Sequence, residues 1–497
     1  MSSATSADTW LERLRGLDLN EFSALKVLVA GDFMLDEYLW GRVERISPEA
    51  PVPIVDVDVE REFHTLGGAG NVVNNLAALG ARVEVLGLVG DDNPGRLLHQ
   101  KLADLGVSPE GLFSDPGRRT SRKTRVMAVS QQVVRIDRET RSPAPPSFNE
   151  DALNYLKGLI PKLDAIILSD YGKGTLTPDF LKKCIQLARE FKIPVVVDPK
   201  GADYSAYAGA TVITPNRKEA ALAAGRSLER WEDLVEAGQR LRRDLSLETL
   251  LITLGAAGMV LFPADGPELH LPARAREVFD VSGAGDTVAA VMALGLARWR
   301  DPVLAASLAN LAAGVVVGKI GTAPITRAEL KREVEGRGPG PEDKIVDLAA
   351  LKGLVPHLKS RGQSIVFTNG CFDLLHVGHI KFLEESRNLG DVLVVAVDSD
   401  ESVTQVKGPG RPVIGERERL RLLAALSTVD YVTLFATGQL PEILAALRPD
   451  ILTKGANYPE AQVAGRDEVL AYGGRVRSFP IREDISSTDL INRIRQD

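Results

Sequence analysis

The chain contains 497 residues, of which 44% are hydrophobic and 26% charged. At about 100–200 residues per domain, this length predicts two or three domains rather than one, and the balanced composition excludes a mainly disordered or fibrous protein. The net charge of −7 argues against a general nucleic-acid binder, and two cysteines, Cys184 and Cys371, exclude a disulfide scaffold.

No segment carries a membrane or secretion signal. Residues 1–20 lack a basic segment followed by an apolar core. The longest apolar runs, such as Thr287–Trp299, are shorter than the roughly 20 residues that cross a bilayer. We therefore expect a cytoplasmic protein with neither a membrane nor a nucleic-acid partner.

Short apolar runs alternate with helical patterns over the first 330 residues or so. Continuous apolar strands between helices predict a mainly parallel sheet that is covered on both faces. The expected strands are Lys26–Gly31, Arg82–Gly90, Ala165–Ser169, Pro194–Asp198, Thr211–Thr214 and Thr249–Thr253, and the expected helices include Asn71–Leu79, Asp179–Phe191 and Trp231–Asp244.

Two further segments, Val52–Glu60 and Thr124–Arg138, alternate apolar and polar residues with a period of two. That period is typical of strands with one exposed face. We expect these segments to form a small antiparallel sheet that acts as a lid.

A change of composition near residue 335 predicts the domain boundary. Glu335–Asp343 is rich in Gly, Pro and charge, which is typical of a linker. The expected division is a first α/β domain at 1–335, a linker at 336–345 and a second α/β domain at 346–497. In the second domain the expected elements are helix Leu348–Arg361, strand Ser364–Thr368, helix Val377–Leu389, strand Asp391–Val397 and strand Ile451–Thr453.

The segment Asp280–Asp286 (DVSGAGD) is a glycine-rich turn that opens a helical run. Such a turn directs backbone N–H groups and the helix dipole at an anion. Gly283 and Gly285 allow a phosphoryl group to approach the backbone, and Asp286 can accept a hydroxyl proton. The alternative is an ordinary helix cap. No G-x-x-x-x-G-K-[ST] motif occurs, which disfavours a P-loop mechanism.

Other polar segments follow the expected strands of the first domain. Asp36 can hold sugar hydroxyls, and Gly67 and Gly68 let a substrate press against the backbone, although each segment alone is more often a turn or cap. Asn216–Glu219 (NRKE) suits a water-bound Mg²⁺ near phosphates, with an ordinary helix start as the commoner interpretation. Gly255 and Gly258 form a tight loop suited to nucleotide contact.

Residues from about 25 to 330 resemble the ribokinase/PfkB sugar-kinase family, because these motifs occur in the family's order. The resemblance implies a ribokinase-like α/β/α domain with a small β lid, and ATP-dependent phosphorylation of a sugar hydroxyl with Mg²⁺ as cofactor. It implies Asp286 as the base, an anion hole of Gly283, Ala284 and Gly285, a sugar site of Asp36, Gly67, Gly68 and Asn71, and an Mg-ATP site of Asn216, Arg217, Lys218, Glu219, Gly255, Gly258 and Asn310.

The second domain contains the turn Asn369–His379 (NGCFDLLHVGH) at the start of a helix. Two histidines three residues apart can meet on one face and donate hydrogen bonds to the oxygens around a reacting phosphorus. Gly378 permits close approach of phosphate. Zinc ligation is the rival interpretation, but no third ligand stands nearby. A pair of capping or core histidines is the other alternative.

Three later segments add cations and backbone donors. Lys407–Pro412 (KGPGRP) is a basic, glycine-containing loop suited to binding a triphosphate, and a solvated hairpin is the alternative. Lys454 and Gly455 follow a strand, and Ile485–Thr488 (ISST) precedes the terminal helix as an anion seat or plain cap.

Residues from about 362 to 497 resemble the cytidylyltransferase-like nucleotidyltransferases. The resemblance implies a Rossmann-like domain in which a substrate phosphate attacks the α-phosphorus of a nucleotide. It implies His376 and His379 as catalytic residues, no direct protein ligand to a metal, and a nucleotide site of Asn369, Gly370, Phe372, Asp373, Gly378, Lys407, Arg419, Lys454, Gly455, Ser486, Ser487 and Thr488.

The order of the two domains resembles a family of heptose kinase–adenylyltransferases. The resemblance is carried by Arg45–Pro53 (RISPEAPVP), Leu168–Gly174 (LSDYGKG), Asp198–Gly201 (DPKG) and Ala312–Lys319 (AAGVVVGK). It implies ATP, heptose 7-phosphate and heptose 1-phosphate as substrates, ADP-heptose for the lipopolysaccharide core as product, and a homodimer formed through the lids.

Within that resemblance, Lys123 and Arg135 are candidates for the 7-phosphate, although exposed strand charges explain them as well. Lys454–Tyr458 reads KGANY where the family usually has KGGDY, so the preference for ATP over CTP rests on the resemblance alone. The alternatives are a ribokinase-like kinase joined to a cytidylyltransferase for another sugar or polyol phosphate, a sensor without catalysis, and a structural scaffold.

Overall fold

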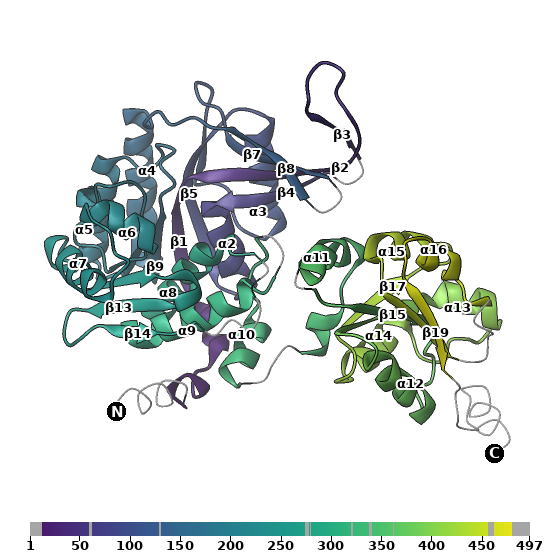
Figure 1. Cartoon of the computed structure of the whole chain (residues 1–497). Coiled ribbons are helices and arrows are strands. Elements are labelled where there is room, and N and C mark those ends of the chain that lie inside the picture. Colours follow the sequence, from purple (N-terminus) through teal and green to yellow (C-terminus); the bar gives the residue numbers. More distant parts are fainter. Residues whose placement is uncertain are drawn as a thin grey trace. The chain divides into compact units, whose positions relative to one another are not determined.

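The computed structural model describes residues 12–58, 62–128, 131–273, 278, 280–319, 322–336, 340–360, 362–455 and 462–479. The chain divides into two compact units, Met1–Gly336 and Arg337–Asp497 (Figure 1). No helix in these described ranges is both long and apolar enough to cross a membrane.

The first unit is built on a nine-stranded sheet with the order β14-β13-β12-β11-β10-β9-β1-β5-β6. Neighbouring strands from β12 to β6 along this order pair in parallel, whereas β13 and β14 are antiparallel. The strands are β1 (Lys26–Gly31), β5 (Arg82–Gly90), β6 (Leu112–Asp115), β9 (Ala165–Ser169), β10 (Val195–Asp198), β11 (Val212–Ile213), β12 (Thr249–Thr253), β13 (Met259–Pro263) and β14 (Leu269–Leu271).

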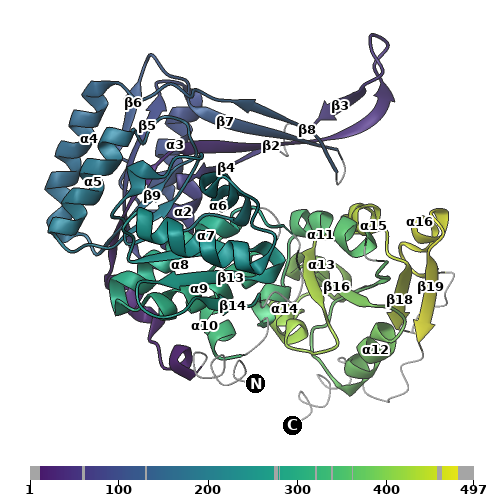
Figure 2. The same ribbon diagram turned by 60° about the vertical axis from the view of Figure 1, so that its left-hand side comes forward.

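Helices cover both faces of this sheet (Figures 1 and 2). Side chains of β1 alternate between the two cores: Val27 and Val29 pack toward α2, α8 and α9, and Leu28 and Ala30 toward α4, α5 and α7. The helices are η1 (Leu19–Ala24), α2 (Ala69–Ala78), α3 (Asn93–Asp104), α4 (Pro146–Leu159), η3 (Ile160–Lys162), α5 (Pro178–Glu190), η4 (Ser205–Tyr207), α6 (Arg217–Ala224), α7 (Trp231–Asp244), η5 (Gly255–Ala257), α8 (Ala284–Trp299), α9 (Pro302–Val316) and α10 (Arg327–Val334).

A second, smaller sheet projects from the body of the first unit (Figure 2). Its order is β3-β2-β7-β8, with β4 also paired to β2. The strands are β2 (Phe33–Ile46), β3 (Pro53–Val57), β4 (Phe63–Gly68), β7 (Ser121–Ala128) and β8 (Gln131–Arg138).

The lid prediction is wrong in one respect, because β2 and β7 pair in parallel while the other lid pairs are antiparallel. The reason is topological. Strand β2 continues from β1 and β7 follows β6, and the parallel sheet brings the carboxyl ends of β1 and β6 to one edge. Both lid strands therefore leave that edge in the same direction.

The second unit contains a five-stranded parallel sheet with the order β17-β16-β15-β18-β19. Helices flank it in Figure 1, which makes the unit Rossmann-like. Its elements are η6 (Pro341–Lys344), α11 (Leu348–Ser360), β15 (Ile365–Gly370), α12 (Val377–Arg387), β16 (Val392–Asp398), α13 (Asp400–Lys407), α14 (Glu416–Ala424), β17 (Tyr431–Phe435), α15 (Leu440–Leu447), β18 (Ile451–Gly455), α16 (Arg466–Ala471) and β19 (Arg475–Phe479).

Candidate active sites

The candidate site of the first unit lies at the carboxyl ends of β1 and β9. Strands β5 and β6 lie on one side of β1 and strands β9 to β12 on the other, so the chain order reverses here. Such a switch point is the usual ligand position in an open α/β sheet. Asp32 follows β1, Tyr171 follows β9, and the amino end of α8 carries Asp286.

Asp286 is buried at 4% exposure in the first turn of α8. Its Oδ2 accepts a hydrogen bond from Asn71 Nδ2 at 2.7 Å, and its Oδ1 accepts one from the Tyr171 hydroxyl at 2.8 Å. Burial raises the pKa of Asp286 to about 6, while these two hydrogen bonds oppose the rise. A carboxylate with a pKa near neutrality is suited to accept a proton from a substrate hydroxyl.

The glycine-rich turn before Asp286 has the geometry of an anion seat. Gly283 caps α8 with φ of 79°, in the left-handed region that favours glycine, and a Cβ there would lie 2.5 Å from Asn71 Nδ2. A Cβ on Gly285 would meet no atom within 4 Å, so the space beside it is open. The 16-residue helix α8 begins here, and its dipole favours an anion at this end, although the Ala284 N–H donates to the Val281 carbonyl at 3.3 Å in this structure.

The expected sugar residues lie together on the lid side. Asp36 of β2 is 5% exposed and forms an ion pair with Arg125 at 3.1 Å. A Cβ on Gly67 would lie 2.9 Å from the Asp36 carboxylate, so any larger residue there would displace that side chain. Lys123 Nζ lies 5.5 Å from the centre of the Tyr171 ring.

Arg135 is not brought into this group. Its guanidinium forms two hydrogen bonds with Asp137, at 2.8 and 2.9 Å, and its side chain is 50% exposed. Arg125 lies directly opposite Arg135 in the lid sheet and is the residue that reaches Asp36.

The expected nucleotide residues surround the same sheet edge. Asn216 and Glu219 form a reciprocal capping box at the start of α6, and Glu219 also pairs with Lys200 at 2.8 Å. This is the ordinary helix-start arrangement that the sequence left open. Arg217 pairs with Glu229, while Lys218 is exposed.

The adenine side of the expected nucleotide site consists of a loop and a helix. A Cβ on Gly258 (φ of 90°) would lie 2.0 Å from the Leu271 carbonyl oxygen, so the loop after β12 requires glycine there. A Cβ on Gly255 would be in open space. Asn310 of α9 donates to the Pro272 carbonyl at 2.8 Å, which ties the helix to the end of β14.

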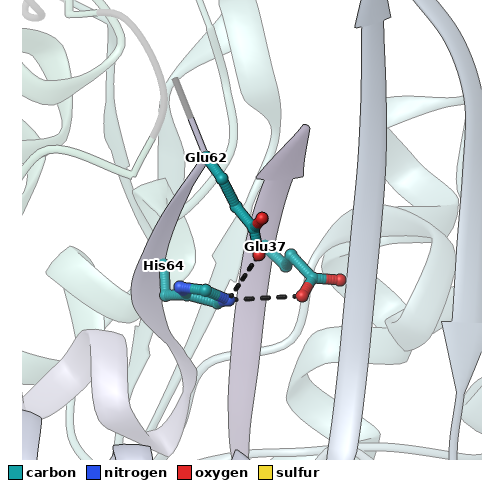
Figure 3. A group of neighbouring side chains, drawn as sticks. All are labelled: Glu37, Glu62 and His64. Carbon is teal, nitrogen blue, oxygen red and sulfur yellow. Dashed lines mark hydrogen bonds and ion pairs between the residues drawn. The ribbon is translucent and has the colours of Figure 1, made fainter. Parts of the chain in front are cut away.

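One group of side chains in the described part of the chain has the spacing of a metal site. Glu37, Glu62 and His64 converge on the lid sheet (Figure 3), with His64 Nε2 at 3.2 Å from Glu37 and 3.5 Å from Glu62. Arg122 already lies 3.3 Å from the same Glu37 oxygen, and Thr124 donates to the other oxygen. The Arg122 guanidinium therefore balances the charge of Glu37 without a metal ion.

The candidate site of the second unit lies at the carboxyl ends of β15 and β18, again where the strand order reverses. His376 caps α12 and His379 lies in its first turn, with ring centres 3.9 Å apart. Burial, then the charges of His376 and Lys407, lower the pKa of His379 to about 4. His379 is therefore neutral at pH 7 and can donate one N–H to an anion.

Lys454 links the two strands at this switch point. Its Nζ donates to the backbone carbonyl of Asn369 at 2.7 Å and to the Asn369 side chain at 3.0 Å. Burial lowers the pKa of Lys454, and the Asp398 charge opposes that shift. Phe372 is buried against His379, with ring centres 5.4 Å apart, and a Cβ on Gly370 would lie 3.2 Å from its ring.

Two charged residues hold the loop that follows α13. Asp373 accepts from Arg411 Nε at 2.6 Å and from the backbone N–H of Val413 at 2.7 Å. Burial alone would raise the pKa of Asp373, but backbone and Arg411 hydrogen bonds hold it below its usual value.

Arg419 is fully buried and bonds the Ile414 and Cys371 carbonyls and the Asp400 carboxylate, at 3.0, 2.6 and 2.6 Å. In this structure Arg419 therefore holds the backbone around the site, and its contact with the nucleotide stays a prediction. Lys407 lies at the carboxyl end of α13 and Gly378 is buried in α12, while Ser486, Ser487 and Thr488 lie outside the described residues.

Sequence reasoning missed four polar residues of the first site. Asp32, Arg125, Tyr171 and Asp198 received no role, although Tyr171 and Asp198 lie in segments that carry the heptose-enzyme resemblance. For Asp32 and Asp198 a signal was available, because each lies at the carboxyl end of a buried strand, where polar side chains reach the ligand-binding edge of the sheet.

Comparisons with known proteins agree with this architecture. Residues 24–328 match the model of the pfkB family of carbohydrate kinases, and residues 367–493 match the cytidylyltransferase-like model. The ribokinase of Arabidopsis thaliana, solved with ribose and ATP, matches 63% of this chain and 98% of its own, with a TM-score of 0.51 and 18% identity. That likeness shows the fold.

The fold and the two sites thus define a two-domain transferase, a carbohydrate kinase followed by a nucleotidyltransferase. The bifunctional protein HldE of Desulfatibacillum aliphaticivorans is 49% identical over 97% of this chain and 99% of its own length. That of Citrifermentans bemidjiense is 50% identical over 95% and 96%. The chain belongs to the family of the bifunctional HldE proteins.

Proposed function

We propose that the first unit transfers the γ-phosphoryl group of ATP to O1 of D-glycero-β-D-manno-heptose 7-phosphate. The likeness to bifunctional HldE proteins along nearly the whole chain carries the proposal, and the buried Asp286 beside an open glycine turn supports it. Asp286 accepts the proton of the O1 hydroxyl while that oxygen forms a bond to the γ-phosphorus, and the bond from phosphorus to ADP breaks.

The anion hole of this reaction is the amino end of α8. We assign Gly283, Ala284 and Gly285 to this hole, beside the open space at Gly285 where the transferred phosphoryl group carries its charge. The Ala284 N–H donates to the Val281 carbonyl at 3.3 Å in this structure, and it exchanges that partner for the phosphoryl group when the substrates bind.

The sugar phosphate binds between the sheet edge and the lid. Asp36, Gly67, Gly68 and Asn71 contact the sugar, and the cations of β7 face its 7-phosphate. Lys123 and Arg125 lie on one face of that strand beside Asp36, which supports this assignment. Arg135 can join them only by leaving Asp137.

ATP brings Mg²⁺ to the same edge, near Asn216 and Glu219, with Arg217 and Lys218 beside them. Oxygen donors suit a divalent cation. Burial and then the charges of Asp286 and Glu219 raise the pKa of Asp198 well above its usual value, and a cation bound here would offset that repulsion between carboxylates. When bound, Mg²⁺ neutralises the phosphate oxygens of ATP. Gly255, Gly258 and Asn310 then line the nucleoside.

We propose that the second unit makes ADP-heptose from ATP and heptose 1-phosphate. A phosphate oxygen of the sugar forms a bond to the α-phosphorus, and the bond to pyrophosphate breaks. Neutral His379 and its neighbour His376 donate to the α-phosphoryl oxygens, and Lys407 and Lys454 add positive charge. A separate phosphatase must remove the 7-phosphate between the two reactions.

We further propose a cytoplasmic homodimer that forms through the lids. Several apolar lid side chains are exposed, and a second lid is an apolar partner that would cover them. They are Val43, Ile46, Val52, Phe63, Val133, Val134 and Ile136.

A coupled assay tests the whole proposal. The protein is incubated with heptose 7-phosphate, ATP, Mg²⁺ and a heptose bisphosphate phosphatase, and the formation of a nucleotide sugar is followed. A parallel incubation of heptose 1-phosphate with either ATP or CTP separates the alternatives. We expect turnover with ATP; turnover with CTP alone would overturn the adenylyl assignment, and release of neither ADP nor pyrophosphate would support a sensor.

A further inference from the structure

The loop after β9 is held from below by one buried carboxylate. Asp32, at 2% exposure, accepts backbone hydrogen bonds from Tyr171 at 2.9 Å, Lys173 at 2.9 Å and Thr175 at 3.1 Å. Three donors on one carboxylate fix the path of residues 171–175, because hydrogen bonds to an ionised acceptor are stronger than neutral ones.

That loop delivers the Tyr171 hydroxyl to the candidate base. The hydroxyl donates to Asp286 Oδ1 at 2.8 Å, while Asn71 holds Oδ2 at 2.7 Å. The two donors come from different elements, the loop after β9 and helix α2. Together they fix both the position of the carboxylate and its rotation about the Cβ–Cγ bond.

We propose that Tyr171 is a positioning residue of the phosphoryl transfer. Its hydroxyl, placed by the hydrogen bonds that Asp32 accepts from the loop, orients the Asp286 carboxylate toward the attacking sugar hydroxyl. Tyr171 acts through Asp286 and takes no proton from the substrate. The inference rests on the proposed function for the role of Asp286 as the base and for the choice of sugar phosphate in the assay.

The charges around Asp286 decide how the loss of this hydrogen bond changes its ionisation. Asp36 from the lid and Asp198 from the end of β10 disfavour the ionised form, whereas Lys123 from β7 favours it. Burial, with Asp286 beside it, raises the pKa of the Tyr171 phenol well above its usual value, so the hydroxyl remains a donor across the assay range. Removing it leaves Asp286 with one donor fewer and a higher pKa.

The test is Tyr171→Phe in the full chain, assayed for ADP release with heptose 7-phosphate between pH 5.5 and 9. We expect kcat to fall about tenfold or more, KM for the sugar phosphate to stay within about twofold, and the acidic limb of kcat to move up by about one pH unit. The substrate phosphate titrates in this range too, but equally for both enzymes. Pyrophosphate release by the second unit of the same preparation serves as an internal control.

The matched control is Tyr155→Phe, which removes a tyrosine hydroxyl that faces Glu84 at 3.4 Å near the amino end of β5. We expect it to leave kcat and its pH limb unchanged. A second variant keeps the ring: replacing Tyr171 by 3-fluorotyrosine lowers the pKa of the phenol and strengthens the donor. We expect that variant to fold normally and to move the acidic limb downward, opposite to phenylalanine.

Three results would overturn the inference. These are a fall in kcat with an unmoved limb in both variants, a rise in KM alone, which would place Tyr171 in direct contact with the sugar, and unchanged kinetics throughout. If the wild-type protein does not phosphorylate heptose 7-phosphate, the proposed substrate fails instead, and the same comparison is made with whichever sugar the wild type turns over.

Discussion

Both units place their candidate phosphate site at the edge of a mainly parallel sheet, but the side chains at the two sites have opposite chemistry. Each places its reactive side chains at the amino end of a helix, at the switch point of a parallel sheet. In the first unit, the carboxylate of Asp286 is held by two donors from other elements. In the second unit, His376 and His379 stack on each other within a single turn.

Burial pushes the two reactive groups in opposite directions, since it disfavours whichever form is charged. It raises the pKa of Asp286 to about 6 and lowers the pKa of His379 to about 4. The carboxylate thereby becomes a base of useful strength, whereas the imidazole becomes a neutral hydrogen-bond donor. In the proposed reactions, this one physical effect supports proton transfer in one unit and electrostatic stabilisation of a transition state in the other.

Asp286→Asn is expected to have the largest effect, because it removes the proposed base of the first unit and leaves the second unit unchanged. Asparagine keeps the shape and one of the two accepting oxygens but cannot take a proton, so we expect kinase turnover to fall by about 10³-fold or more. ADP release with heptose 7-phosphate measures this, and pyrophosphate release with heptose 1-phosphate is expected to stay at the wild-type level. Kinase activity above a tenth of wild type would show that Asp286 is not the base.

His379→Ala tests the other half. Loss of one fixed donor to a developing oxyanion costs about 10²–10³-fold in rate, and we expect pyrophosphate release to fall by that factor. The kinase reaction of the same preparation is expected to be unchanged. A parallel loss of both activities would contradict independent sites in the two units.

Arg419→Met tests how much a buried charged residue contributes to the backbone around a site. Asp32 holds the loop after β9 in the first unit, and Arg419 holds the backbone at Cys371 and Ile414 in the second unit. The change leaves Asp400 and two carbonyls without their buried partner, and we expect about 3 kcal/mol less free energy of unfolding for the second unit. Urea denaturation of the full chain, with the unfolding of each unit followed separately, measures this free energy of unfolding.

The control for Arg419→Met is Arg421→Met on the same helix. Arg421 is 68% exposed and pairs with Glu342, so we expect a loss of less than about 1 kcal/mol. Equal losses for the two variants would mean that burial of Arg419 contributes nothing to stability.

Much of the fold was predictable from the sequence. The bounds of β1, β5, β9 and β12 match the predicted runs, because an apolar run buried on both faces leaves an unambiguous pattern. Strand β2 was missed. Phe33, Met34 and Leu35 are all buried without alternation, and the polar residues around them had indicated a turn.

The candidate sites divide in the same way. Residues at helix starts, such as Asp286 and His379, could be predicted because a short motif carries both the turn and the reactive group. Arg125 and Tyr171 could not, since their positions depend on strand register and on a loop anchored 139 residues away in the chain. The burial of Arg419 could not be predicted, because a helix rich in charge does not reveal which arginine is buried, and its contact with the nucleotide stays a prediction.

The smallest expected effect concerns pH, and it tests the opposite action of burial directly. At pH 5, one unit below a pKa of about 6, only about a tenth of Asp286 is ionised, so we expect kinase kcat at saturating substrate to fall about tenfold from its value at pH 8. At pH 5, one unit above a pKa of about 4, only about a tenth of His379 is charged, so its imidazole signals in a heteronuclear NMR titration are expected to move from pH 8 to pH 5 by no more than about a tenth of their full titration shift. A histidine that titrates near 6.5 would show that its surroundings do not exclude charge, and the contrast between the two units would then rest on geometry alone.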